Sequence, residues 1–341
     1  MTSETTEKLI ADFSKRSILI VGDVMLDDYI SGDVTRISPE APVPILNITS
    51  RYACLGGAAN VALNIKSLGA TPVLCSVIGK EQKSDDFLTI MQQQNLSVRG
   101  ICQSKDRILT TKYRALGNKM QLLRLDNEVT HPLSPKDEQN LSETITSIIH
   151  SQRIDAIIVE DYDKGVVTPL LIRELLALAN QKSIPLTVDP KKRNFSSYQG
   201  TTLFKPNWKE FKEGTQLEIN AWNDPALPDA IRRFMSEKQH KNILLTLSDN
   251  GMLICQNEPL FTCTHIPSCE RKVADVSGAG DTVISVATLC LSSGLEIKNM
   301  AELANLAGGL ACEEAGVTAI DKERFIKEIN KYYHENKNDL Y

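Results

Sequence analysis

The sequence lacks long apolar runs, and this absence excludes membrane-spanning classes of protein. No segment of the 341-residue chain approaches the run of about 18 apolar residues that a transmembrane helix needs. The N-terminal stretch MTSETTEKLIADFSKRS carries acids early and has no apolar centre. It therefore does not resemble a secretory signal peptide, and we expect a cytoplasmic protein.

Excess positive charge and paired cysteines are also missing. The formal net charge is −5, whereas proteins that bind nucleic acid through its phosphates carry a basic surface. A nucleic-acid partner is therefore not expected. The 8 cysteines include no CxxC pair, and their spacing fits no common zinc pattern. Reduced thiols, typical of a cytosolic protein, are the expectation.

The chain does contain a repeated alternation of short apolar runs and helical patterns. Runs typical of buried strands are SILIVG, PVLCSVIG, DAIIVED, IPLTVDP and NILLTLS. Helical periodicity follows most of them, for example from Ala58 to Leu68, where Gly69 ends the pattern. This alternation predicts an α/β fold with a doubly wound, mainly parallel sheet and helices on both faces.

Two β-rich segments, at about 28–55 and 98–127, interrupt this alternation. The second contains a hairpin pattern with its turn at Gly117-Asn118. We expect the two segments to pair as a small second sheet, which would form a lid over a single domain covering 1–341. Exposed strand edges invite pairing with another chain, so a homodimer through the lid is also expected.

Polar side chains follow several of the predicted strands. Ligands of α/β proteins bind outside the carboxyl ends of the strands. The residues at those positions are Asp23, Asp27, Glu160, Asp161, Asp189, Lys191, Asn207, Glu210, Thr246 and Ser248. Any one of them also suits a turn or a helix cap, but their recurrence after five strands predicts a site.

The stretch LGGAANVALN combines glycines with the start of a helix. Gly56 and Gly57 allow backbone to approach a ligand closely, and Asn60 lies one turn into the helix. A tight loop-to-helix junction is equally typical of this pattern, so the stretch alone does not decide between the two interpretations.

A second glycine-rich stretch, DVSGAGDT, precedes a nearly uniformly apolar helix. The small residues Ser277 to Gly280 leave backbone N–H groups free to converge on an anion at the helix N-terminus. Asp281 is an ordinary capping acid in one interpretation. Beside a bound phosphate it would instead accept a proton from an attacking hydroxyl. The Walker A pattern GxxxxGK[ST] is absent.

These stretches resemble a known family. GGAANVALNIKSLGATPVLCSVIG and DVSGAGDTVISVAT resemble the two signatures of the pfkB (ribokinase-like) carbohydrate kinases, with Val286 where the family usually has Ala or Gly. KPNWKE resembles the family's N-x-x-E motif. The resemblance implies a ribokinase-like fold and ATP- and Mg²⁺-dependent phosphorylation of a sugar.

Further stretches are similar to one branch of that family, the D-glycero-β-D-manno-heptose-7-phosphate kinases. They are RISPEAPVP, TKYRALGNKMQLLRLD, EDYDKG and VDPK. This similarity implies phosphorylation at O1 to the 1,7-bisphosphate, in the synthesis of ADP-heptose for lipopolysaccharide. Many bacteria fuse this kinase to an adenylyltransferase, and the chain is expected to be the single-function form.

The resemblance also implies roles for individual residues. Asp281 would be the general base, and the amides of Gly278, Ala279 and Gly280 would stabilise the transferring phosphoryl group. Glu210 would help to hold Mg²⁺ through water, and Asp275 and Ser277 match positions that hold a monovalent cation, often K⁺. Sugar contacts would come from Asp27, Gly56, Gly57, Asn60 and Asp161, and nucleotide contacts from Asn207, Thr246, Ser248, Gly251 and Asn305.

A sugar phosphate also needs cations, and the β-rich segments supply them. Lys112 and Arg124, with Arg36 and Arg114, suit charge-assisted contacts to a phosphate. Each is equally typical of a solvated strand. Two alternatives stay open at this point: another pfkB kinase, acting on a fructose phosphate, a pentose or a keto-deoxy sugar, and a catalytically silent sugar-binding regulator.

Overall fold

A computed structural model describes residues 3–118, 120–269 and 271–338. Over these residues the strands form a nine-stranded and a four-stranded sheet. The large sheet contains, in spatial order, β13 (Thr262–Ile266), β12 (Met252–Gln256), β11 (Asn242–Thr246), β10 (Leu203–Phe204), β9 (Leu186–Asp189), β8 (Ala156–Glu160), β1 (Ser17–Gly22), β4 (Thr71–Ile78) and β5 (Ile101–Gln103). Its strand pairs are parallel except β11–β12 and β12–β13.

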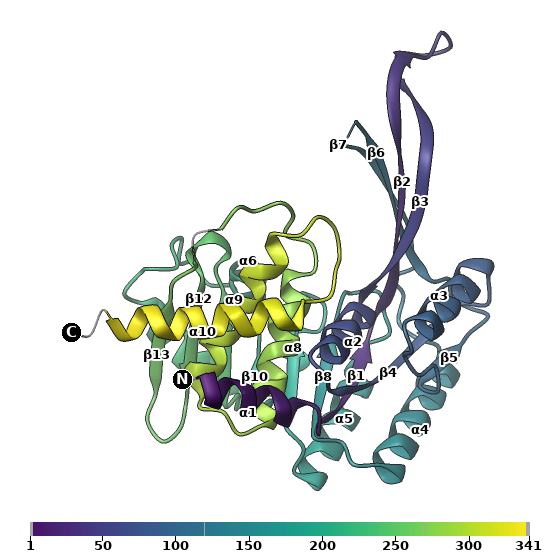
Figure 1. Cartoon of the computed structure of the whole chain (residues 1–341). Helices are drawn as coiled ribbons and strands as arrows, with labels where there is room; N and C mark the ends of the chain where they lie inside the picture. Colours follow the sequence, from purple (N-terminus) through teal and green to yellow (C-terminus); the bar gives the residue numbers. More distant parts are fainter. Residues whose placement is uncertain (1–2, 119, 270, 339–341) are drawn as a thin grey trace.

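Helices pack on both faces of this sheet, and the alternation of strand side chains shows why (Figure 1). In β1, Ile18 and Ile20 belong to one hydrophobic core, and Leu19 and Val21 belong to the other. The first core contains side chains of α1 (Ser3–Phe13), α2 (Ala58–Ser67), α3 (Gln82–Gln93), α8 (Ala279–Ser292), α9 (Ile297–Cys312) and α10 (Lys322–Asn338). The second contains those of α4 (Pro135–Ser151), α5 (Pro169–Lys182), α6 (Trp208–Thr215) and α7 (Leu227–Lys238). The predicted doubly wound fold is confirmed.

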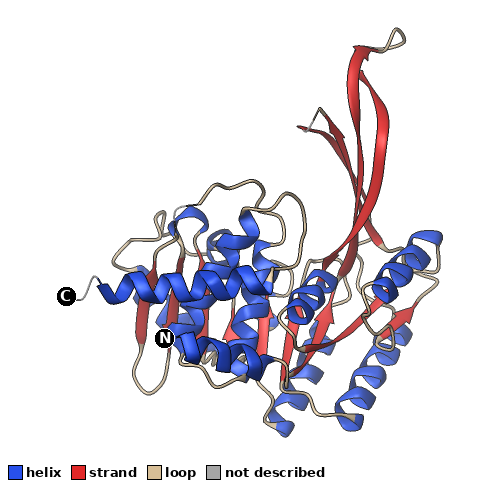
Figure 2. Ribbon diagram, viewed as in Figure 1, coloured by secondary structure: helices blue, strands red, loops and turns tan. Residues whose placement is uncertain are grey.

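The small sheet projects away from this body (Figure 2). It contains β3 (Pro44–Gly57), β2 (Val24–Ile37), β6 (Thr110–Gly117) and β7 (Met120–Asn127), in this spatial order. The β6–β7 hairpin has its turn where the sequence predicts it. The sequence pattern around 28–55 suggests short strands, but β2 and β3 are each 14 residues long. The segment expected from residue 98 contributes to the small sheet only from Thr110, because β5 pairs with β4 in the large sheet.

One prediction about the cysteines is wrong. Cys255 and Cys263 form a disulfide between the neighbouring strands β12 and β13. Direct pairing across two antiparallel strands brings their side chains together, and sequence spacing alone does not reveal this register. The six other cysteines are free thiols. None of the helices within the described ranges is both long and apolar enough to cross a membrane.

Candidate active site

The predicted site residues gather where the large sheet's parallel strands end and α8 begins. Asp23 follows β1, Glu160 ends β8, Asp189 ends β9 and Asn207 lies just after β10. Parallel strands place their carboxyl ends at one edge of the sheet, so residues far apart in sequence become neighbours. The location predicted from the strand ends is therefore the one that the fold produces.

Asp281 lies in the first turn of α8 and is only 2% exposed. Its Oδ2 accepts a hydrogen bond from Asn60 Nδ2 at 2.7 Å, and its Oδ1 accepts one from the Tyr162 hydroxyl at 2.7 Å. Burial raises the pKa of Asp281 to about 6 against these two hydrogen bonds, which lower it. A carboxylate with this pKa is ionised at neutral pH yet basic enough to accept a proton.

The glycine-rich loop before α8 is a tight turn whose glycines approach other parts of the protein closely. Gly278 is the N-cap and adopts φ +80°, a conformation that favours glycine. A Cβ on Gly280 would lie 3.5 Å from Asp189 Oδ2 and 3.6 Å from Lys205 Nζ, so this part of the loop faces the buried Lys205–Asp189 ion pair. The Ala279 amide donates to the Val276 carbonyl at 3.3 Å. The role predicted for the three amides stays a prediction.

A cavity of about 510 Å³ opens beside this loop. Lys205 and Lys191 are two of the lysines that line it: Lys205 pairs with Asp189 at 2.7 Å, and Lys191 pairs with Glu210 at 2.5 Å. Burial lowers the pKa of both ammonium groups, but the nearby carboxylates outweigh it and leave both pKa values raised. Both lysines therefore stay charged, and with the N-terminus of α8 they make this cavity suited to polyphosphate. Other residues that line it include Tyr162, Asn207, Trp208, Glu210, Thr246, Ser248 and Gly280.

The N-x-x-E motif forms a local structure at the start of α6. Asn207 Oδ1 accepts from the Glu210 amide and Glu210 Oε2 accepts from the Asn207 amide, both at 2.8 Å, which is a capping box. The capping box fixes the Glu210 carboxylate at the cavity wall. Mg²⁺ commonly binds through one or two carboxylates, water and substrate phosphates. Asp189 and Glu210 provide such a donor set.

Asp27 belongs to β2 and lies against the first glycine stretch. It is 2% exposed and pairs with Arg114 of β6. A Cβ on Gly56 would lie only 2.5 Å from Asp27 Oδ2, and one on Gly57, which has φ +60°, would lie 2.5 Å from the Asp23 carbonyl oxygen. Burial raises the pKa of Asp27 although Arg114 opposes the shift. Glycine at position 56 therefore allows this carboxylate to approach closely, and glycine at position 57 allows the positive φ and the close approach of the Asp23 backbone.

Three cations of the small sheet, Lys112, Arg114 and Arg124, lie on the same face as Asp27. Strand pairing sets Asp27 beside Lys112 and Arg114 beside Arg124. Lys112 and Arg114 are two residues apart in β6, so their side chains point to one face. Arg124 pairs with Asp126 at 2.9 Å and is about half exposed. This face therefore presents positive charge above the strand ends.

Asp161 and Asn305 make contacts within the protein. Asp161 is buried and accepts from Asn194 at 3.0 Å and from the Tyr198 hydroxyl at 2.9 Å. These contacts favour a structural role. Asn305 donates to the Pro267 carbonyl at 2.8 Å, and Gly251 adopts φ +82° in a turn where a Cβ would lie 2.1 Å from the Ile266 carbonyl oxygen. Their predicted ligand contacts stay predictions.

Asp275 and Ser277 form a compact turn before α8. Asp275 Oδ1 accepts from the Ser277 amide at 3.0 Å and hydroxyl at 2.9 Å, and its Oδ2 accepts from the Gly316 amide at 3.1 Å. Burial raises the pKa of Asp275, but these hydrogen bonds outweigh it and leave the pKa lowered. The carboxylate is therefore ionised, as a cation ligand must be.

Tyr162 and Lys205 are cavity residues that the predicted site did not include. Tyr162 carries no charge, and it directly follows Glu160 and Asp161, which are more obvious candidates at a strand end. Lys205 directly follows the short strand β10, and its signal was the strand-end position that identified Asn207. Glu160 lies beside them and is fully buried, and neither of its carboxylate oxygens has a hydrogen-bond partner among the described residues. Burial and the nearby Asp189 raise its pKa well above the ordinary value.

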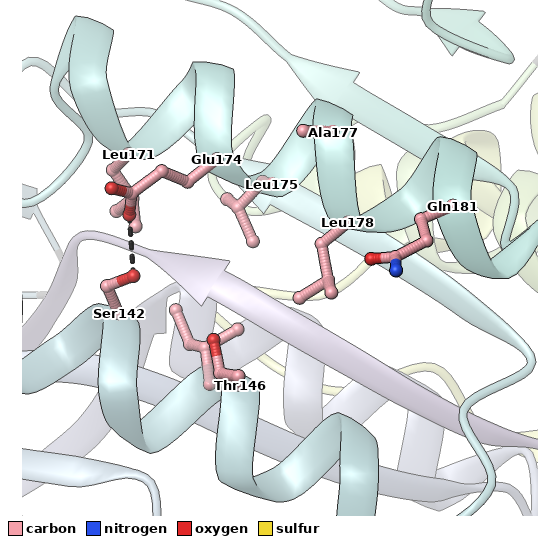
Figure 3. A pocket seen from close by; sticks show the side chains of 9 residues that line it. Ser142, Thr146, Leu171, Glu174, Leu175, Ala177, Leu178 and Gln181 are labelled. Carbon is pink, nitrogen blue, oxygen red and sulfur yellow. Dashed lines mark hydrogen bonds between the residues drawn. The ribbon is translucent and has the colours of Figure 1, made fainter.

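A separate hollow of about 300 Å³ lies between α4 and α5 (Figure 3). Leu171, Leu175 and Leu178 line it, and Ser142 donates to Glu174 across it at 2.5 Å. It contains none of the strand-end residues and is a groove between packed helices.

Comparisons with known proteins agree with this geometry. Residues 15–324 match the model of the pfkB family carbohydrate kinases. The "Bifunctional protein HldE" of Granulibacter bethesdensis is 36% identical over 324 residues, covering 94% of this chain and 66% of that protein. The protein of the same name from Geobacter sulfurreducens is 32% identical over 335 residues, covering 98% of this chain and 67% of its own length. The chain thus spans about two thirds of the length of the curated relatives that it matches.

Solved structures share the fold. Phosphofructokinase-2 from Escherichia coli, solved with fructose-6-phosphate, has a TM-score of 0.74 at 19% identity, covering 93% of this chain and 98% of that one. That enzyme has also been solved with potassium. Ribokinase from Thermotoga maritima has a TM-score of 0.65 at 19% identity, covering 92% of this chain and 99% of that one. The fold is therefore ribokinase-like.

The environment of Asp281 predicts where its carboxyl group titrates. We expect a midpoint near pH 6, against about 3.9 for an ordinary aspartate. Measurement is by ¹³C NMR of chain labelled at aspartate carboxyl carbons, with the resonance identified by its loss in Asp281→Asn. A midpoint close to 4 would show that burial does not dominate this site.

Proposed function

The chain belongs to the pfkB family of carbohydrate kinases, and we propose that it phosphorylates D-glycero-β-D-manno-heptose 7-phosphate at O1, with ATP as donor. The observation that carries the proposal is the position of Asp281. This carboxylate is bonded to Tyr162, which lines the cavity that suits the polyphosphate, and to Asn60, which follows the glycine stretch that suits the sugar. A phosphoryl donor and a hydroxyl acceptor bound on these two sides would meet at Asp281.

The proposed reaction needs little covalent chemistry from the protein. The O1 hydroxyl loses its proton to Asp281 while O1 forms a bond to the γ-phosphorus, and the bond from that phosphorus to the β,γ-bridging oxygen breaks to release ADP. Lys205, Lys191 and the loop amides face the negative charge that is transferred. Catalysis would then arise from positioning and charge stabilisation.

Two kinds of cation accompany this proposal. Mg²⁺ bound with ATP would offset the charge of the phosphates, and Glu210 and Asp189 would hold it, through water on the Glu210 side. Asp275 and Ser277 would hold a monovalent cation such as K⁺. The ionised carboxylate of Asp275 supports this second assignment.

The choice of a heptose 7-phosphate is supported by two observations. The stretches RISPEAPVP and EDYDKG resemble those of heptose-7-phosphate kinases. The face of the small sheet that carries Asp27 also carries Lys112, Arg114 and Arg124, and these suit a phosphate at the far end of the substrate. We also propose that the chain acts in the cytoplasm and contributes to the synthesis of lipopolysaccharide precursors.

Substrate preference is tested with a panel of sugars in a coupled ADP-release assay. We predict that kcat/KM is highest for heptose 7-phosphate when it is compared with fructose 1-phosphate, fructose 6-phosphate, ribose and a keto-deoxy sugar. A higher kcat/KM for another sugar of the panel would assign a different pfkB activity to the chain. No ADP release with any sugar would favour a sugar-binding regulator.

The base is tested by Asp281→Asn. We predict that kcat falls by about 10²–10⁴ because the amide cannot accept the hydroxyl proton, whereas the Kd for ATP stays nearly unchanged. Asp229→Asn, at a residue of α7 outside the site, is the matched control and should keep wild-type kcat. Near-normal turnover in Asp281→Asn would exclude this residue as the base.

We also propose that the chain forms a homodimer through the small sheet. Leu123 and Leu125 lie on the face opposite Arg124 because side chains alternate along β7, and they are 52% and 57% exposed. Exposed apolar side chains on an edge strand favour pairing with a second copy.

The dimer is tested by sedimentation equilibrium at micromolar concentration. We predict twice the chain mass for the wild type and a single-chain mass for the double variant Leu123→Lys, Leu125→Lys. Leu260→Lys, at a residue that is 77% exposed and lies between β12 and β13, should remain dimeric. A wild-type protein of single-chain mass would refute the dimer.

A further inference from the structure

Tyr162 contacts the proposed base directly. Its hydroxyl donates a hydrogen bond of 2.7 Å to Oδ1 of Asp281, although the two residues are 119 positions apart. The side-chain amide of Asn60 donates a hydrogen bond to the other oxygen, Oδ2. The carboxylate therefore has one protein donor on each oxygen, which fixes the plane of the group.

The backbone around Tyr162 is held by a second buried carboxylate. Asp23, at the end of β1 and 1% exposed, accepts from the amides of Tyr162 at 2.8 Å, Lys164 at 3.1 Å and Val166 at 2.9 Å. Hydrogen bonds of this charge-assisted kind are among the stronger ones in proteins. The loop after β8 is thus tied to the neighbouring strand, and Tyr162 is carried on a well-supported segment.

The ring of Tyr162 lies between the two substrate sides of the site. It lines the cavity beside the α8 loop. Lys191 Nζ lies 5.3 Å from the ring centroid and Lys112 Nζ, from the small sheet, lies 5.8 Å from it. Burial and the nearby Asp281 raise the pKa of the phenol well above 10, so the hydroxyl is a donor at every physiological pH.

The two hydrogen bonds leave lone pairs of the Asp281 carboxylate available to the substrate hydroxyl. An ionised carboxylate offers about four lone-pair positions, and Tyr162 and Asn60 each take one. Asp189 and Lys205 also act on Asp281, the first raising its pKa and the second lowering it, and the buried Glu160 interacts with it as well. The remaining lone pairs are those with which a substrate hydroxyl can bond.

We propose that Tyr162 is a positioning residue, which holds the Asp281 carboxylate ionised and in the orientation that meets the acceptor hydroxyl. The role of Asp281 in this statement rests on the proposed function. The contact itself is a property of the protein alone. It is therefore open to a measurement that does not depend on catalysis.

The test compares Tyr162→Phe with Tyr198→Phe. Both remove one phenolic hydroxyl that donates to an aspartate, but Tyr198 bonds to Asp161 instead of Asp281. Loss of a hydrogen bond to the charged form of Asp281 should raise its carboxyl pKa by about one unit. The ¹³C titration of Asp281 should therefore move upward from about 6 in Tyr162→Phe and stay unchanged in Tyr198→Phe. An unmoved titration in Tyr162→Phe would overturn the proposal.

The kinetic readout separates this inference from the proposed function. In Tyr162→Phe we expect kcat for the best sugar of the panel to fall about 10- to 100-fold, the KM for ATP to stay within about twofold and the acid limb of the pH profile to move upward by about one unit. If the wild type phosphorylates no sugar, the proposed function fails, and the NMR titration still decides whether Tyr162 positions Asp281. If the wild type is active and the acid limb of Tyr162→Phe is unmoved, the positioning role alone fails.

Discussion

The pair of hydrogen bonds on the Asp281 carboxylate is the interaction on which the site depends. One comes from Asn60 on α2 and the other from Tyr162 after β8, so the carboxylate connects three segments that are distant in sequence. A hydrogen bond to a charged group contributes about 1.5–3 kcal/mol. These two bonds offset part of the cost of burying the charge, and they leave a base whose pKa, about 6, lies near neutrality.

The surroundings of that carboxylate show the same balance between burial and charge. Lys205 is 3% exposed and is paired with Asp189, although desolvation makes buried ion pairs weak contributors to stability. Such a pair is retained where it positions a charge for binding, and Lys205 lines the cavity that suits polyphosphate. Glu160 is buried without a hydrogen-bond partner among the described residues, and burial and the nearby Asp189 raise its pKa well above the ordinary value.

Much of the fold was predictable because strand and helix periodicity differ, and each buried strand in the sequence became a strand of the large sheet. The glycine stretch before Asp281 was also predictable, since small residues directly before an apolar helix are typical of a backbone anion site. Tyr162 could not be identified in this way, because its contact with Asp281 depends on which strands are neighbours, whereas Lys205 had the same strand-end signal as Asn207 and was overlooked. Asp161 had the same strand-end signal as Asp23, yet both face protein donors.

The proposed mechanism requires above all that the acceptor hydroxyl meets Asp281 in line with the γ-phosphoryl group. A crystal structure of the chain with heptose 7-phosphate and a non-hydrolysable ATP analogue tests this requirement most directly. We predict the sugar O1 within hydrogen-bond distance, about 2.6–3.2 Å, of an Asp281 carboxylate oxygen and opposite the β,γ-bridging atom. An O1 outside that range, with the γ-phosphate directed at another group, would contradict the mechanism.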